Sequence, residues 1–419
     1  MGDMVLQARA KLNLTLKILG RRPDGYHDIE SVVQSVDLCD RITLRTCSPV
    51  YAGRSGQEID ITVTCNDTSI PTGRGNLAVE AVLALANFVG LRASAETDAC
   101  PRASVEIEAD PRASVEMDAD PGVSVETDAC PRASVEIEAD PRASVEIDME
   151  KRIPVAAGLG GGSADAAAVL IGLNHLWRLG LGERELMAVG ESLGADIPFC
   201  VTGGTGVIRG KGERIELLPT PDDLWFVVVT LPERVSTAQA YTTFDQLTET
   251  TGAYDAGSYD LAVDATDVTS GMVRALRAGE VQDIAGRLTN DLEYSAVSIV
   301  PQIARAKEAL LAAGAVGVGM SGSGPTVFGI ADSREKAETI CDTLRLTSSG
   351  GALEQVSSYD VPKLSSSGGT PKQASSACAK EQASSGGTFA IGAFKEVFVC
   401  RAVSQGVAYA RVPDAGARH

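Results

Sequence analysis

Residues 154–168 read Pro154-Val155-Ala156-Ala157-Gly158-Leu159-Gly160-Gly161-Gly162-Ser163-Ala164-Asp165-Ala166-Ala167-Ala168. This order predicts a short apolar strand, a glycine-rich turn and then an alanine-rich helix. Glycines let the backbone approach a ligand closely, and the start of a helix offers unpaired N–H groups with partial positive charge. The stretch therefore predicts an anion site, most simply for phosphate. A tight strand-to-helix turn without a ligand would have the same pattern.

Two common nucleotide-binding patterns are absent from this loop. No lysine follows a glycine at the spacing of G-x-x-x-x-G-K-[ST], and the last position of G-x-G-x-x-G is occupied by Ser163. The kind of phosphate loop must therefore be identified from other parts of the chain.

The composition is that of a globular protein with two or three domains, because 419 residues are too many for one core. No apolar run reaches the roughly 18 residues that span a bilayer, and early charges argue against a signal peptide. Nine scattered cysteines without a C-x-x-C pair indicate reduced thiols. We expect a cytoplasmic protein, or one in a plastid-like compartment in a plant, without a membrane partner.

The net charge of −19 argues against a nucleic-acid partner. Much of this charge lies in residues 94–148, which hold fifteen acidic and four basic residues. The acidity therefore belongs to one segment and says little about the ligand of the rest.

That segment is a decapeptide repeat with prolines at positions 101, 111, 121, 131 and 141. Each unit contains a short alternating piece that predicts a half-buried strand. We expect the last copy, Ser144–Asp148, to occupy one slot in a sheet and the other copies to form an acidic, mobile loop. An acidic partner-binding arm or a calcium-binding array are the alternatives, although calcium repeats normally carry more glycines and carboxylates per turn.

A second insertion covers residues 347–388, where Ser-Ser-Gly-Gly recurs every 18 residues and predicts a flexible segment. Outside the two insertions, strands and helices follow one another without strict alternation, which favours an α+β fold. We expect an N-terminal domain over 1–218 and a C-terminal domain over 219–419. The expected strands are 5–19, 40–46, 207–208, 216–218, 224–231, 327–330 and 396–401, and the expected helices are 76–89, 164–179, 183–193, 271–278, 281–288 and 304–313.

Four further stretches carry side chains suited to chemistry. Lys11 and Asn13 lie two apart in a predicted strand, so they share one face. Tyr26 and His27 place an aromatic ring and an imidazole in a turn. Asp196 is a single carboxylate in an apolar frame at a helix end. The fourth stretch is a second glycine-rich loop that contains Ser321, Gly322, Ser323 and Gly324.

Together these stretches resemble the GHMP kinase superfamily, whose three motifs match residues 10–14, 154–168 and 319–329. Residues 20–27, 193–199 and 290–293 narrow the resemblance to the branch that acts in the non-mevalonate isoprenoid pathway. The resemblance implies a two-domain α+β kinase with its active site in the cleft between the domains. It also implies transfer of the ATP γ-phosphoryl group, with Mg²⁺, to the 2-hydroxyl of a methylerythritol unit that carries a cytidine diphosphate.

The resemblance also implies roles for individual residues. Asp196 would take the hydroxyl proton and Lys11 would stabilise the developing alkoxide, although alone the two would suggest a structural ion pair. Tyr26 and His27 suit the cytidine end, since an aromatic ring can stack on a base and an imidazole can donate or accept at its edge. The substrate-binding residues are expected to be Asn13, Tyr26 and His27, and the ATP-binding residues Asn76, Lys151 and every residue from Pro154 to Ala164.

Several alternatives stay open at this point. Tyr26 and His27 could belong to a packed hairpin turn, Asn76 could be a helix N-cap, and Lys151 could be a solvated charge. The chain departs from the family in its two insertions and at Ala164, where many members have a second serine. The metal ligands are not identified. Another small-molecule kinase of the superfamily, or a catalytically silent nucleotide-binding protein, is the alternative function, and a monomer or a homodimer is expected.

Overall fold

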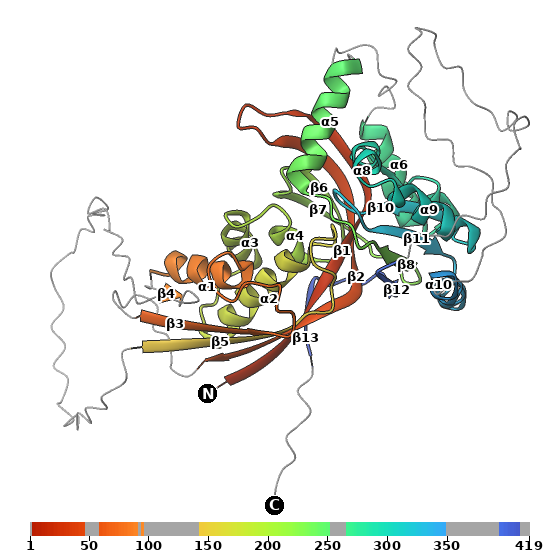
Figure 1. Cartoon of the computed structure of the whole chain (residues 1–419). Coiled ribbons are helices and arrows are strands. Elements are labelled where there is room, and N and C mark those ends of the chain that lie inside the picture. Colours follow the sequence, from red (N-terminus) through yellow and green to blue (C-terminus); the bar gives the residue numbers. More distant parts are fainter. Residues whose placement is uncertain are drawn as a thin grey trace, which may run out of the picture.

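The computed structural model describes residues 2–46, 58–90, 94–95, 142–251, 265–348 and 394–410. Two long strands, β1 (Gly2–Arg21) and β2 (His27–Thr46), pair antiparallel and run through the molecule (Figure 1). The turn between them is closed by a hydrogen bond from the Arg22 N–H to the Tyr26 carbonyl (2.7 Å). Gly25 supplies a φ of 86° in this turn, a conformation that costs a glycine little.

The first sheet is built around this hairpin, in the order β13-β1-β2-β5-β3-β4, with β6 and β7 extending from β2 and β9 beside β1. Helices cover one of its faces and share an aliphatic core with it (Figure 1). The other strands of this sheet are β3 (Glu58–Cys65), β4 (Ser94–Ala95), β5 (Arg142–Glu150), β6 (Thr205–Gly210), β7 (Arg214–Leu218), β9 (Thr289–Asn290) and β13 (Val407–Tyr409). Its helices are α1 (Leu77–Phe88), α2 (Gly161–Leu176), α3 (Glu183–Glu191) and α4 (Ile197–Thr202).

The second sheet has the order β10-β11-β8-β12. Alternate residues of β8 enter two different cores: Val227 and Val229 pack with the neighbouring helices, and Phe226 and Val228 face the core that includes β1. Burial on both faces explains why this strand is continuously apolar. The strands are β8 (Trp225–Thr230), β10 (Gly317–Met320), β11 (Val327–Ala331) and β12 (Glu396–Arg401). The helices that follow β8 are α5 (Thr237–Thr251), α6 (Ala265–Ala278), α7 (Val281–Ala285), α8 (Glu293–Ile299), α9 (Gln302–Ala312) and α10 (Arg334–Ser348).

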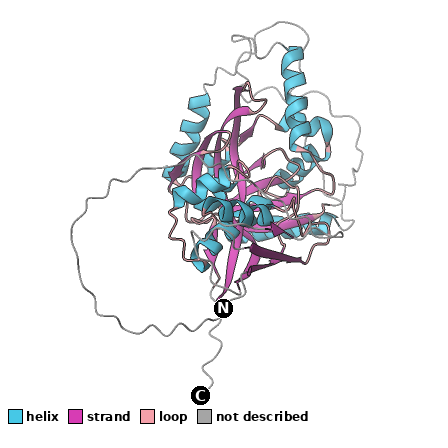
Figure 2. Ribbon diagram, turned by 90° about the vertical axis from the view of Figure 1, so that its left-hand side faces the viewer, coloured by secondary structure: helices cyan, strands magenta, loops and turns pink. Residues whose placement is uncertain are grey.

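The α+β class is confirmed, since helices and largely antiparallel sheets are mixed along the chain (Figure 2). The boundary at 218/219 stays a prediction. Strands from beyond that boundary join the first sheet, because β9 and β13 both pair with β1. None of the described helices combines the length and the hydropathy of a membrane-spanning segment.

The last copy of the decapeptide repeat forms part of β5, as predicted, and lies between β2 and β3. Ser94 and Ala95, which stand five repeat periods earlier, form β4 on the opposite edge of β3. Ser94 and Ser144 are both paired with Asp60, in the same parallel register. The remaining repeat copies, and the second insertion beyond Ser348, lie outside the described residues.

The predicted short strand at Pro154–Ala157 is wrong. Strand β5 ends at Glu150, and the chain then follows turns up to helix α2. Pro154 has no N–H to donate to a sheet, and Ala156 adopts a φ of 55°, which no strand contains. The glycine-rich stretch is therefore a loop along its whole length before the helix begins.

Candidate active site

The glycine-rich loop presents its backbone at the start of helix α2. Gly158 and Gly160 adopt left-handed φ values of 76° and 71°, and Gly160 is the N-cap of the helix. The side chains of Pro154, Ala157, Leu159 and Ala164 are buried, so they anchor the loop in the core. The half-buried hydroxyl of Ser163 forms no hydrogen bond within the part of the chain that the structure describes. Main-chain N–H groups and one hydroxyl at a helix start are chemically suited to hold an anion.

The two glycine loops contact each other. The Ser321 hydroxyl donates a hydrogen bond to the Gly158 carbonyl (2.9 Å), and a Cβ at Gly158 would lie only 2.4 Å from the Ser321 carbonyl oxygen. Ser323 is held from the other side, since its hydroxyl lies 3.0 Å from that of Thr237 at the start of α5. The second loop therefore packs directly on the first.

Lys11, Asn13 and Asp196 meet beside these loops. The Lys11 ammonium donates to the Asn13 side-chain oxygen (2.8 Å) and lies 3.5 Å from an Asp196 carboxylate oxygen. The Lys11 stem packs over Gly160, where a Cβ would lie 3.1 Å from it. The register of β1 against β2 shifts on both sides of this segment, between Arg9 and Lys11 and between Asn13 and Thr15. Register shifts of this kind, or β-bulges, change the direction of side chains and are common next to functional sites.

Asp196 is the N-cap residue of helix α4, but its side chain does not cap the helix. The side chain is 38% exposed, whereas that of Lys11 is 6% exposed. The cluster therefore presents one accessible carboxylate beside one buried ammonium. This arrangement can remove a proton from a bound hydroxyl and stabilise the anion that results.

Asn290 supports the second loop, a role that its sequence context alone did not predict. Its side-chain amide donates to the carbonyls of Met320 (2.9 Å) and Gly322 (2.8 Å), and its oxygen accepts from the Leu292 N–H (2.9 Å). The sequence singled out residues 290–293 only through the family resemblance. The hydrogen bonds from Asn290 to the second loop have no local signal, because they join segments that are distant along the chain.

Lys151 lies beneath the glycine-rich loop and is not solvated. Its ammonium donates to Asp40 and to Asp165 (2.5 Å), and its side chain is 6% exposed. Burial raises the pKa of Asp165 to about 8, with Lys151 opposing this rise and Asp40 adding to it. Burial alone would lower the pKa of Lys151, but the two carboxylates outweigh this effect and raise it. Asn76 is indeed an N-cap, since its side chain accepts from the Ala78 N–H (2.9 Å).

Tyr26 and His27 lie at the far end of the β1–β2 hairpin. The Tyr26 ring is 62% exposed, with the Lys211 ammonium 4.6 Å from its centroid. The His27 ring is buried and lies 2.7 Å from an Asp245 carboxylate oxygen. The turn that carries Lys211 packs on the residue before Asp196, since a Cβ at Gly212 would lie 2.6 Å from the Ala195 carbonyl oxygen. The structure thus links this end to the Lys11–Asp196 pair.

Comparisons with known proteins agree with this architecture. Residues 131–204 match the GHMP kinases N terminal domain, and residues 272–347 match the GHMP kinases C terminal domain. The 4-diphosphocytidyl-2-C-methyl-D-erythritol kinase of Gloeobacter violaceus is 39% identical over 81% of this chain and 89% of its own length. The protein of that name from Pelotomaculum thermopropionicum is 38% identical over 81% of this chain and 93% of its own.

Solved structures give the same result. A crystal structure of 4-(cytidine 5'-diphospho)-2C-methyl-D-erythritol kinase aligns with a TM-score of 0.53 and 27% identity, over 82% of this chain and 96% of that one. Homoserine kinase from Cytophaga hutchinsonii aligns with a TM-score of 0.60 over 98% of both chains, but at 17% identity it supports the fold alone. These matches confirm a small-molecule kinase of the GHMP fold, and the chain belongs to the 4-diphosphocytidyl-2-C-methyl-D-erythritol kinase family.

Proposed function

We propose that this chain transfers the γ-phosphoryl group of ATP to the 2-hydroxyl of 4-diphosphocytidyl-2-C-methyl-D-erythritol. The observation that carries the proposal is the Lys11–Asp196 pair, which lies beside two contacting glycine loops in a chain of this family. Phosphoryl transfer depends on alignment and charge stabilisation more than on covalent chemistry by the protein. A loop, a helix start and a lysine–aspartate pair supply these requirements.

The phosphates of ATP are proposed to bind at the loop from Gly158 to Ser163 and at the first turn of α2. The positive φ of Gly158 and Gly160 supports this proposal, because these conformations turn consecutive N–H groups toward one anion. The second loop would complete the cradle through Ser321 and Gly322. Its contact with Gly158 keeps the two loops at a fixed separation.

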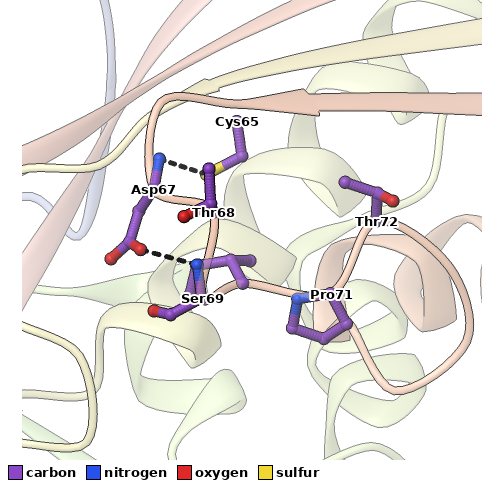
Figure 3. A pocket seen from close by; sticks show the side chains of 7 residues that line it. Cys65, Asp67, Thr68, Ser69, Pro71 and Thr72 are labelled. Atoms are coloured by element: carbon purple, nitrogen blue, oxygen red, sulfur yellow. Dashed lines mark hydrogen bonds between the residues drawn. The ribbon is translucent and has the colours of Figure 1, made fainter.

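A hollow beside Asn76 and Lys151 is proposed to receive the adenosine end of ATP. It has a volume of about 440 Å³ and is lined by Cys65, Asp67, Thr68, Ser69, Ile70, Pro71 and Thr72 (Figure 3). The Asn76 side chain donates to the Pro71 carbonyl (2.8 Å), and Asn66 exchanges two hydrogen bonds with the Lys151 backbone. Leu77, the residue after Asn76, connects this hollow to the proposed phosphate loop, because its side chain lies 3.4 Å from where a Cβ of Gly162 would be.

Asp196 is proposed to accept the proton of the 2-hydroxyl, and Lys11 to stabilise the alkoxide. The exposed carboxylate supports the first role, since a general base must reach the proton that it removes. Burial of the Lys11 side chain supports the second role, because a charge acts more strongly where water is excluded. Asn13 holds the ammonium in place with its side-chain oxygen.

Mg²⁺ is proposed as the metal that accompanies ATP. Mg²⁺ in nucleotide sites is usually held by one or two protein groups together with substrate phosphates. The Ser163 hydroxyl, which has no hydrogen-bond partner among the described residues, is a protein group that fits it. When bound, Mg²⁺ would neutralise charge on the phosphate oxygens.

Tyr26 and His27 are proposed to bind the cytidine end of the substrate. The exposed Tyr26 ring supports this proposal, since a base can stack on its face. We further expect a cytoplasmic enzyme, a monomer or a homodimer, without a nucleic-acid partner.

A substrate panel tests the proposed function. The purified full chain is given ATP with the cytidyl-methylerythritol substrate, mevalonate, homoserine or galactose, and ADP release is measured. We expect turnover with the first substrate at least a hundredfold above the others, the ratio that a site built for one polar substrate produces. Absence of turnover with the first substrate, or faster turnover with another, would refute the assignment.

A further inference from the structure

Helix α5 holds the His27 ring on two sides. The Nε2 atom of His27 lies 2.7 Å from Oδ1 of Asp245, and the ring stacks on Tyr241 with a centroid separation of 4.7 Å and an interplanar angle of 27°. Tyr241 and Asp245 are one helical turn apart and therefore share a face of α5. The His27 side chain is 6% exposed and that of Asp245 is 18% exposed, so the contact is shielded from solvent.

The carboxylate determines which ring nitrogen carries the proton. A carboxylate can only accept a hydrogen bond, so the neutral imidazole must place its single N–H on Nε2. Arg21 lies 3.5 Å from the second Asp245 oxygen, so Asp245 contacts both His27 and Arg21. In this neutral form Nδ1 keeps its lone pair and can only accept, and it forms no hydrogen bond to any residue that the structure describes.

We propose that Asp245 is a positioning residue that makes His27 a hydrogen-bond acceptor and thereby selects cytosine over uracil at the cytidine end of the substrate. This inference rests on the proposed function. The sequence alone left open whether the imidazole donates or accepts, and the Asp245 contact decides between the two. Cytosine carries an amino group, a donor, where uracil carries a carbonyl oxygen, an acceptor. With uracil, Nδ1 of His27 and the carbonyl oxygen of the base would both be acceptors, so no hydrogen bond could form between them.

The expected preference is about tenfold to a hundredfold, which corresponds to one buried polar group left without a partner. The test uses the full-length Asp245→Asn variant. An amide can either accept from Nε2 or donate to it, so the ring is no longer held in one protonation pattern. We expect the ratio of kcat/KM for the cytidine substrate to that for its uridine counterpart to fall by about tenfold or more.

Most of this change should lie in the KM of the cytidine substrate, while the KM for ATP stays within about twofold of the wild type. Glu249→Gln is the matched control, because it makes the same change of charge one turn further along α5 at an exposed position. It should keep the wild-type ratio. An equal fall in kcat/KM for both substrates in Asp245→Asn would show that Asp245 has a merely structural role and would overturn the proposal.

The protonation pattern can be read directly from the ¹⁵N shifts of the ring, since the chain has only three histidines: His27, His175 and His419. We expect wild-type His27 to show a protonated Nε2 and an unprotonated Nδ1, and Asp245→Asn to lose that pattern. A proton on Nδ1 in the wild type would overturn the proposal. If the wild type turned over the cytidine substrate and its uridine counterpart at equal rates, the proposed selection of cytosine would be refuted and the proposed function would stand. If it turned over neither substrate, the proposed function would be refuted.

Discussion

The Lys11 ammonium lies 3.5 Å from the Asp196 carboxylate, with the lysine on strand β1 and the aspartate at the start of helix α4. The Asp196 side chain is 38% exposed and the Lys11 side chain is 6% exposed, so the carboxylate is open to solvent and the ammonium is not. Because the pair lies beside the glycine-rich loop, we propose that it serves catalysis.

Replacing the proposed base tests this explanation. We predict that Asp196→Asn lowers kcat by about 10²- to 10⁴-fold, the usual contribution of a general base. The KM for ATP should change little, because the carboxylate faces the acceptor hydroxyl in this account. Steady-state kinetics with the cytidyl-methylerythritol substrate measure both quantities.

Asp223→Asn is the control for this variant, because it makes the same chemical change at an exposed position in the segment before β8. It should leave kcat unchanged. If Asp196→Asn retains more than about a tenth of the wild-type kcat, Asp196 is not the base.

The contact between the two glycine loops gives a second prediction. A methyl group at Gly158 would meet the Ser321 carbonyl oxygen at 2.4 Å, in addition to the strain of a left-handed φ. We predict that Gly158→Ala raises the KM for ATP at least tenfold and destabilises the fold by several kcal/mol, about 1–2 kcal/mol of it from the backbone strain. Kinetics and denaturant unfolding measure the two effects.

Gly90→Ala is the control that separates the backbone strain of a left-handed φ from the steric clash with Ser321. Gly90 has the same φ of 76°, but no atom of the described residues lies within 4 Å of a Cβ there. This variant should lose only about 1–2 kcal/mol and keep the wild-type KM for ATP. Equal effects of the two substitutions would mean that the loop contact is unimportant.

Much of the candidate site follows from local patterns. The glycine-rich loop can be predicted because its glycines and the helix start are contiguous. The shared face of Lys11 and Asn13 can be predicted because side chains alternate along a strand. The strand β12 begins and ends where predicted. The last repeat copy forms part of β5, as expected from its link to the loop.

Other features depend on contacts that no local pattern encodes. Helix α5 was missed because its threonines favour strands, yet it supplies Asp245 and Tyr241 to His27. Asn290 supports the second loop from a two-residue strand. Lys151 looks like a surface charge in sequence, and only the fold encloses it between Asp40 and Asp165.

Asn290 therefore gives a third prediction. In Asn290→Asp a carboxylate would face the carbonyls of Met320 and Gly322, which now accept hydrogen bonds from the amide. We predict a loss of about 2–4 kcal/mol in the free energy of unfolding and a fall in kcat/KM of at least tenfold. Denaturant unfolding and steady-state kinetics measure these changes.

Asn174→Asp is the comparison, because Asn174 likewise donates to a carbonyl and accepts from an N–H, both of Leu181, but at the end of α2 away from the loops. It should lower stability and leave kcat/KM near the wild-type value. A similar kinetic loss in both variants would point to general destabilisation instead.

The buried cluster of Lys151, Asp40 and Asp165 beneath the glycine-rich loop predicts a pH dependence of stability. Asp165 has an ordinary pKa of 3.8, raised to about 8 mainly by burial. Between these values the folded protein holds a proton that the unfolded chain has released, so the Asp165 contribution to stability falls as the pH rises from about 4 to about 8. Above pH 8 this contribution levels off.

Asp165→Asn should remove this dependence, because an amide is neutral throughout and can still accept from Lys151. The free energy of unfolding of the wild type minus that of the variant should fall by about 1 kcal/mol or more between pH 5 and pH 9. Urea unfolding at several pH values measures it. A difference that stays constant would contradict a raised pKa at Asp165.

The most direct test of the proposed function is the identity of the product. The full chain is incubated with ATP and 4-diphosphocytidyl-2-C-methyl-D-erythritol, and the product is examined by ³¹P NMR and mass spectrometry. The account predicts one new phosphomonoester on the 2-hydroxyl for each ADP formed, and a large loss of that product in Asp196→Asn. ADP without this phosphomonoester, or a phosphoryl group on another hydroxyl, would contradict it.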